Sequence, residues 1–145
     1  MRTTESKFLT ATLTGIVITI IAGAILFPVV YVAVDSLFEL YIFTDPPPNV
    51  WVKDVLLILI AYIWLFVAAA AGGWACAGIS KHDEYSHALF LAVLWTVTVS
   101  LLYLYSASEE PFGMLILVII VGIAGYFIGT ALRMRRKRKA RQAIK

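Results

Sequence analysis

Charged residues, cysteine and histidine are all scarce in this sequence. Only 14% of its 145 residues are charged, against about 25% in soluble domains, and it has one cysteine and two histidines. A single cysteine cannot form an intrachain disulfide, which excludes a disulfide-stapled secreted scaffold. Because 61% of the residues are apolar and the mean hydropathy is +0.90, a soluble enzyme and a disordered tail are excluded as well.

Asp, Glu, Lys, Arg and His are all missing from four long apolar stretches, residues 8–34, 55–79, 88–105 and 114–132. About 20 apolar residues in a helix cross a bilayer core of about 30 Å. The stretches show no period-2 alternation, which argues against a membrane barrel. The sequence therefore predicts an all-α, polytopic membrane protein, with four transmembrane helices in a bundle over residues 1–133 and a basic tail at 134–145.

The connections between these spans carry residues typical of helix ends. Residues 35–54 are expected to form the one long connection. Asn49 is expected to cap the second helix, and Ser80 with Asp83 has the spacing of a capping box before the third. Ser108 and the acidic residues after it suit the start of the fourth helix.

Positive charge gathers on one side of the predicted membrane. Eight of the 12 Lys and Arg residues lie at 133–145, and an even number of spans places Arg2, Lys7 and Lys81 on the same side. Lys53 is the only cation on the other side. The positive-inside rule therefore predicts a multi-pass protein of the plasma (inner) membrane with both termini in the cytoplasm.

The basic run that follows the fourth span predicts contact with anionic lipid headgroups, at roughly 1 kcal/mol per cation. It has no interleaved aromatic residues for base stacking and no accompanying nucleic-acid-binding fold, so no nucleic-acid partner is expected. The cations expected to contact anionic lipid are Arg133, Arg135, Arg136, Lys137, Arg138, Lys139 and Arg141.

Small residues recur along the second and fourth spans. Lipid gives no hydrophobic drive for helix association, so transmembrane helices gain mainly from close packing, which small residues permit. Two uses fit this pattern: packing within one four-helix bundle, or contact with a second copy or a larger membrane complex. The predicted helix-packing residues are Gly72, Gly73, Ala77, Gly122, Gly125 and Gly129.

The second and fourth spans also end alike. In each, a glycine (Gly73 or Gly125) precedes an aromatic residue, a small residue follows four positions after the glycine, and a cation follows eight after it. Unless the likeness is chance, it predicts two parallel helical-hairpin repeats related by an axis along the membrane normal.

No catalytic, cofactor-binding or metal-binding residue is predicted, because no Asp, Glu, Lys, Arg or His lies within a span. The turn from His82 to His87 holds the only His and acidic cluster. It has too few ligands for a closed zinc site, and it is expected to be a solvated turn and helix cap. Cys76 is expected to be a small packing residue, with S-acylation as the alternative.

The stretch Ala71-Gly72-Gly73-Trp74-Ala75-Cys76-Ala77-Gly78-Ile79, followed by His87-Ala88-Leu89, resembles uncharacterised small prokaryotic four-helix membrane proteins. Those proteins carry a similar Gly-Gly-aromatic helix end and a His-Ala helix start. They typically have an arginine where this chain has Ala77 or Gly78. The resemblance implies a four-helix membrane fold and no particular activity.

Two functions follow from this architecture. The first is a non-enzymatic membrane protein that acts as an accessory or scaffold subunit and packs through its small-residue helix faces. The alternative is a small channel-like or holin-like homo-oligomer whose pore is lined by threonine and serine. Neither requires a cofactor.

Overall fold

The computed structural model describes residues 2–42, 50–80, 84–105 and 112–142, and within these ranges it consists of four α-helices. The helices are α1 (Arg2–Ile42), α2 (Val50–Ile79), α3 (Glu84–Tyr105) and α4 (Phe112–Gln142). Each is long and apolar enough to cross a membrane. The predicted all-α, four-helix architecture is confirmed.

Most of the apolar side chains point away from the protein interior. Only 17–28% of the residues in each candidate span are buried within the chain. Large apolar residues are exposed on every helix; examples are Leu9, Leu59, Leu101 and Ile120. Since such a surface is stable in lipid but not in water, the chain is an integral membrane protein.

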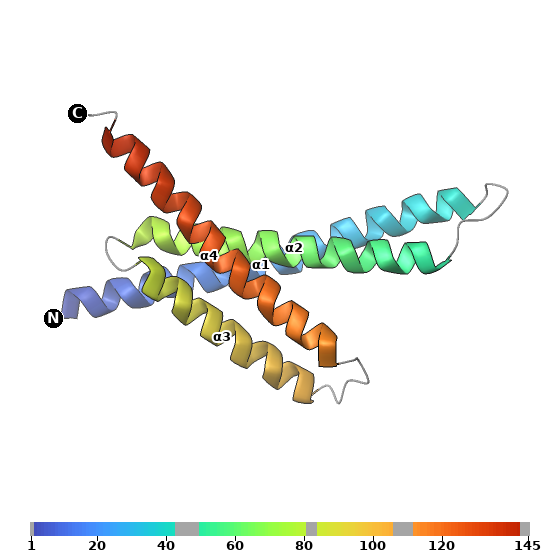
Figure 1. Cartoon of the computed structure of the whole chain (residues 1–145), viewed down its shortest axis with the longest axis horizontal. Helices are drawn as coiled ribbons and strands as arrows, with labels where there is room; N and C mark the ends of the chain where they lie inside the picture. The colour runs from blue at the N-terminus through green and yellow to red at the C-terminus, as the bar shows by residue number, and fades with distance from the viewer. Residues whose placement is uncertain (1, 43–49, 81–83, 106–111, 143–145) are drawn as a thin grey trace.

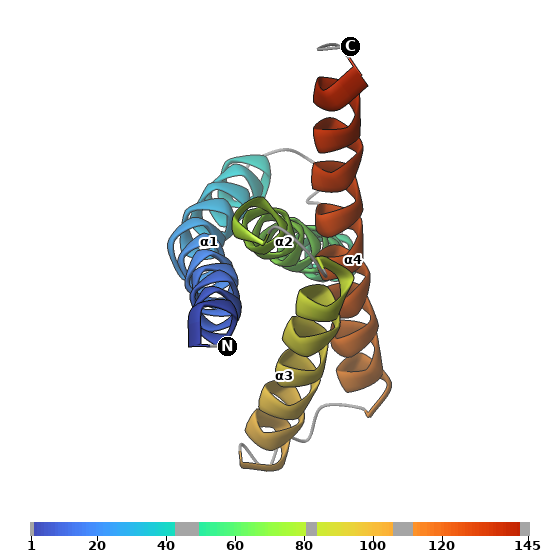
Figure 2. The ribbon, with the colours of Figure 1, turned by 90° about the vertical axis from the view of Figure 1, so that its left-hand side faces the viewer.

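The helices form two antiparallel hairpins, α1–α2 and α3–α4, which cross obliquely (Figure 1). The start of α1, the end of α2, the start of α3 and the end of α4 lie at one end of the molecule, which we call the terminal end. The other ends of the four helices lie at the opposite end, the loop end. Figure 2 shows α2 between α1 and α4, with α3 beside α4. The central contact is therefore between α2 and α4, which run in the same direction.

The predicted connection at 35–54 was wrong at both ends, because the helices extend beyond the apolar runs. Of the expected connection at 35–54, residues 35–42 belong to α1 and residues 50–54 to α2. After Val34 the next residue that resists helix is Pro46. Similarly, α4 continues through the basic run to Gln142, because Arg and Lys are good helix formers.

Several predicted helix caps involve residues outside the described ranges, among them Asn49, Asp83 and Ser108. Ser80 is described, and its amide donates to the carbonyl oxygen of Cys76 at 3.1 Å, which continues the hydrogen bonding of α2 by one residue.

The buried core lies where the two hairpins cross. It is small and made largely of small side chains, which is what allows four helices to meet with so little buried surface. Its members are Ala11, Ala69, Cys76, Leu91, Ala92 and Tyr126.

Candidate functional site

The small-residue faces of α2 and α4 are in close contact. A side-chain carbon added at Gly73 would overlap the carbonyl oxygen of Tyr126, and one added at Gly129 would overlap that of Ala70. At Gly125 it would lie 2.8 Å from the carbonyl oxygen of Phe66. The two backbones therefore touch, and glycine is the only residue that fits without movement at these positions.

A second close contact joins α1 to α2. A carbon added at Gly72 would overlap the Thr19 hydroxyl and lie 2.8 Å from the carbonyl oxygen of Gly15. Thr19 donates to the Gly15 carbonyl at 2.9 Å, and the Tyr126 hydroxyl donates to Thr19 at 3.4 Å. This chain of hydrogen bonds ties α4 to α1 across the glycine contact.

The remaining predicted packing residues are also enclosed. Gly122 faces the Trp95 indole, which an added carbon would overlap. Ala77 is fully buried, and Thr130, one residue after Gly129, donates to the Gly73 carbonyl at 3.2 Å. All six predicted residues thus lie at contacts within one chain. By contrast, a carbon added at Gly23 would meet no described atom within 4 Å.

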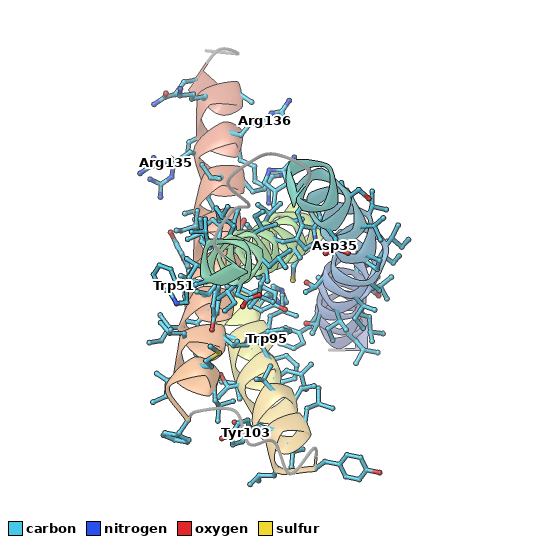
Figure 3. The ribbon with its side chains drawn as sticks, turned by 90° about the vertical axis from the view of Figure 1, so that its right-hand side faces the viewer. Asp35, Trp51, Trp95, Tyr103, Arg135 and Arg136 are labelled. Carbon is cyan, nitrogen blue, oxygen red and sulfur yellow. The ribbon has the colours of Figure 1, made fainter. Side chains whose placement is uncertain are left out.

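In each hairpin, one tryptophan forms a hydrogen bond that joins the two helices. The Trp64 indole on α2 donates to the Ala22 carbonyl of α1 at 3.1 Å, and the Trp95 indole on α3 donates to the Val118 carbonyl of α4 at 3.4 Å. Figure 3 shows Trp95 on α3, near the level of the crossing. Neither of these two contacts was predicted from the sequence. These hydrogen bonds depend on a facing carbonyl that sequence alone does not reveal.

A cavity of about 580 Å³ lies between the hairpins on the loop-end side of the crossing. Its walls are almost entirely apolar. Three of its polar lining residues, Thr19, Trp64 and Trp95, already donate to backbone carbonyls. The lining comprises Thr19, Ile20, Gly23, Ala24, Ile58, Ala61, Tyr62, Trp64, Leu65, Ala68, Trp95, Met114 and Val118.

At the terminal end, Lys137 of α4 joins three helices. Its Nζ donates to the carbonyl oxygens of Ala77 at 2.6 Å and Ser80 at 2.9 Å, and to Glu84 Oε1 at 3.1 Å. The carbonyls at the end of a helix lack partners in their own helix and carry partial negative charge, so a lysine stabilises them. Glu84 suits the positive first turn of α3 for the same electrostatic reason. We call this arrangement the Lys137 clasp.

Arg133, one helical turn before Lys137, also lies against α2. Its guanidinium carbon is 4.2 Å from the centre of the Trp74 ring, within the range of a cation–π interaction. It also lies across Gly78, where an added carbon would be 3.5 Å from Nε. Two of the seven cations predicted to contact lipid therefore make contacts inside the chain.

The other cations of the run are outside these contacts. The side chains of Arg135, Arg136, Arg138 and Lys139 are exposed, and Figure 3 shows Arg135 and Arg136 projecting to opposite sides of α4. The side chain of Arg141 is outside the described part of the structure. The six described cations of this run thus lie in different environments, which depend on the position of each residue around α4.

The histidine turn differs from its predicted form. His82 and Asp83 lie outside the described ranges. His87 is not solvated: it is only 4% exposed, and its ring stacks on Phe8 at a centroid distance of 4.3 Å. The reason is that α3 begins at Glu84, which places His87 on the face turned toward α1. Among the described residues, no three His, Cys, Asp or Glu side chains come together as metal ligands. Cys76 is buried in the core.

Comparison of the chain with protein-family models, with curated proteins and with solved structures finds no match. The resemblance to small prokaryotic four-helix membrane proteins stays a prediction, and function has to be inferred from the geometry.

Proposed function

We propose that this integral membrane protein is a non-enzymatic accessory or scaffold subunit of a larger membrane assembly. Its small-residue faces hold its own helices together, and its outer apolar faces are what it offers to a partner. We further propose that it lies in the plasma (inner) membrane with both termini in the cytoplasm, because the terminal end carries nearly all of the cations.

One observation carries this proposal: three of the polar side chains that line the cavity are already hydrogen-bonded to backbone carbonyls, and two of these bonds join neighbouring helices. Transport and catalysis in membranes usually need ionisable or polar groups that face an accessible space. Here Thr19, Trp64 and Trp95 border the cavity, but each donates to a backbone carbonyl. Such use of polar groups is what a structural subunit needs.

The positions of several threonines do not favour the channel-like alternative. Thr12 and Thr19 are buried inside the single chain. The hydroxyls of Thr14 and Thr96 donate to the carbonyls of Thr10 and Ala92, four residues earlier in their own helices. A pore lined by hydroxyls would be better served by threonines gathered on one outward face.

Native mass spectrometry of the protein extracted in mild detergent from its own membranes tests the proposal. We expect a complex that contains a different, larger polypeptide at fixed stoichiometry. A closed homo-oligomer that conducts ions when reconstituted into liposomes would contradict the proposal and favour the pore.

A further inference from the structure

Arg133 occupies a distinctive position at the boundary of the membrane. It is the first cation after the apolar run that ends at Leu132, so its side chain begins at the edge of the hydrocarbon core. The ring beneath it, Trp74, is 39% exposed. Tryptophan is enriched at this depth, where an apolar ring meets the polar headgroups.

The guanidinium is held on a prepared surface of α2. Trp74 and Gly78 are one helical turn apart, so they lie on the same face of α2. The ring stacks on the cation at 4.2 Å, and the guanidinium lies across Gly78, where an added carbon would be in ordinary van der Waals contact with Nε at 3.5 Å. We call this surface the Trp74–Gly78 shelf. It fixes the cation in place without neutralising its charge.

Within the described residues, no acidic side chain pairs with the Arg133 guanidinium. The Nε atom of Arg133 is buried and has no hydrogen-bond partner there. Glu84, the nearby acid of α3, is paired with Lys137 at 3.1 Å. The exposed Arg135, Arg136, Arg138 and Lys139 on the same helix add further positive charge. The corner formed by α2 and α4 therefore has an excess of positive charge at headgroup depth.

We propose that Arg133, held on the Trp74–Gly78 shelf, binds the phosphate of an anionic phospholipid in the membrane leaflet at the terminal end. Arginine binds phosphate well because its planar guanidinium presents several donors in a fixed geometry. The lysine of the clasp is already satisfied, so it contributes structure rather than lipid contact. This site deepens the lipid contact expected of the basic run, and it does not depend on the accessory role.

The full chain, purified in a non-ionic detergent, is titrated with phosphatidylglycerol and, separately, with phosphatidylcholine of the same acyl chains, and bound lipid is counted by native mass spectrometry. We expect phosphatidylglycerol to bind at least about tenfold more tightly. Arg133→Gln should lower its affinity roughly tenfold, as expected for the loss of one charge-assisted contact.

Arg135→Gln is the matched control, because it removes the same charge from an exposed side chain on nearly the opposite side of α4. It should change the affinity less than about twofold. Arg133→Lys keeps the charge, so it should fold even if Arg133→Gln does not; we expect it to lose about threefold, because an ammonium cannot replace the planar fork.

Three results would overturn the proposal. One is an equal loss for Arg133→Gln and Arg135→Gln, which would indicate diffuse attraction by the whole basic run. Another is equal binding of the two lipids to the wild-type chain. The third is displacement of phosphatidylglycerol by millimolar inorganic phosphate, which would indicate a site for free phosphate. None of these results bears on whether a partner protein exists.

Discussion

The two ends of the crossing are built differently. On the terminal side, α2 and α4 touch backbone to backbone through Gly73 and Gly129. On the loop side, the hairpins separate around an apolar cavity of about 580 Å³, and the indoles of Trp64 and Trp95 reach to carbonyls of the neighbouring helix. This difference shows that two helices approach each other more closely in lipid where the side chains between them are small.

The contrast has an energetic reason. Where helices touch, many small dispersion contacts are gained at once, and these replace the hydrophobic drive that lipid does not provide. Where the hairpins separate around the cavity, this close contact between them is lost, and the indole hydrogen bonds hold together the two helices of each hairpin. We therefore expect the close contact to tolerate added volume poorly and the open side to tolerate it well.

Adding one carbon on each side of the crossing should give opposite results, and this is the largest effect we expect. Gly129→Ala should destabilise the fold by about 3 kcal/mol, the upper end of the usual cost of overpacking, because the new carbon overlaps the Ala70 carbonyl. Thermal or denaturant unfolding of the purified chain in detergent measures this.

Gly23→Ala is the matched control. Its added carbon meets no described atom within 4 Å, and alanine favours helix over glycine by up to about 1 kcal/mol. It should therefore leave the stability unchanged or raise it. Equal destabilisation by the two substitutions would show that the two sides are packed alike.

The Lys137 clasp strengthens the closed side, and its loss should have an intermediate effect. Lys137→Met leaves the Ala77 and Ser80 carbonyls without this donor and Glu84 without its cation. We expect a cost of about 1.5 kcal/mol, since the lysine is partly exposed. The same unfolding assay applies, with the exposed Lys139→Met as control. A loss of the same size in both variants would mean that the clasp contributes nothing specific.

The smallest effect should come from the open side. Trp95→Phe removes the hydrogen bond to the Val118 carbonyl but keeps an aromatic ring against Gly122. Hydrogen bonds between transmembrane helices average about 0.6 kcal/mol, so we expect a loss of that order. Trp64→Phe, whose bond is shorter, should cost slightly more. A loss for Trp95→Phe larger than that for Gly129→Ala would reverse the comparison.

The four helices could be predicted from sequence because their signal is local: long apolar runs without Asp, Glu, Lys, Arg or His admit few alternatives. The errors fell at helix ends. Residues 35–42 were assigned to a loop because they contain acidic residues, although nothing there breaks a helix before Pro46. The sequence analysis made no prediction of secondary structure for the basic tail, and α4 continues through it to Gln142, since arginine and lysine favour helix.

The partners of each residue could not be predicted, because they depend on how helices rotate and cross. The glycines could be recognised as packing residues. The sequence could not show that Gly129 faces Ala70, whereas an added carbon at Gly23 would meet no described atom within 4 Å. Lys137 and Lys139 are the same residue type two positions apart, but only Lys137 donates to a carbonyl at the end of α2, and Lys139 is exposed. The hypothesis of duplicated hairpins stays a prediction.

The central claim is that lipid surrounds four membrane-spanning helices, and the proposed topology places both termini on the cytoplasmic side. The most direct measurement is a pair of fusions to a reporter that is active only in the cytoplasm, one after Lys145 and one after Glu110. We predict activity for the fusion after Lys145, none for the fusion after Glu110, and retention of both proteins in membranes washed with alkaline carbonate. An inactive, membrane-bound fusion after Lys145, or release of the chain by carbonate, would contradict the account.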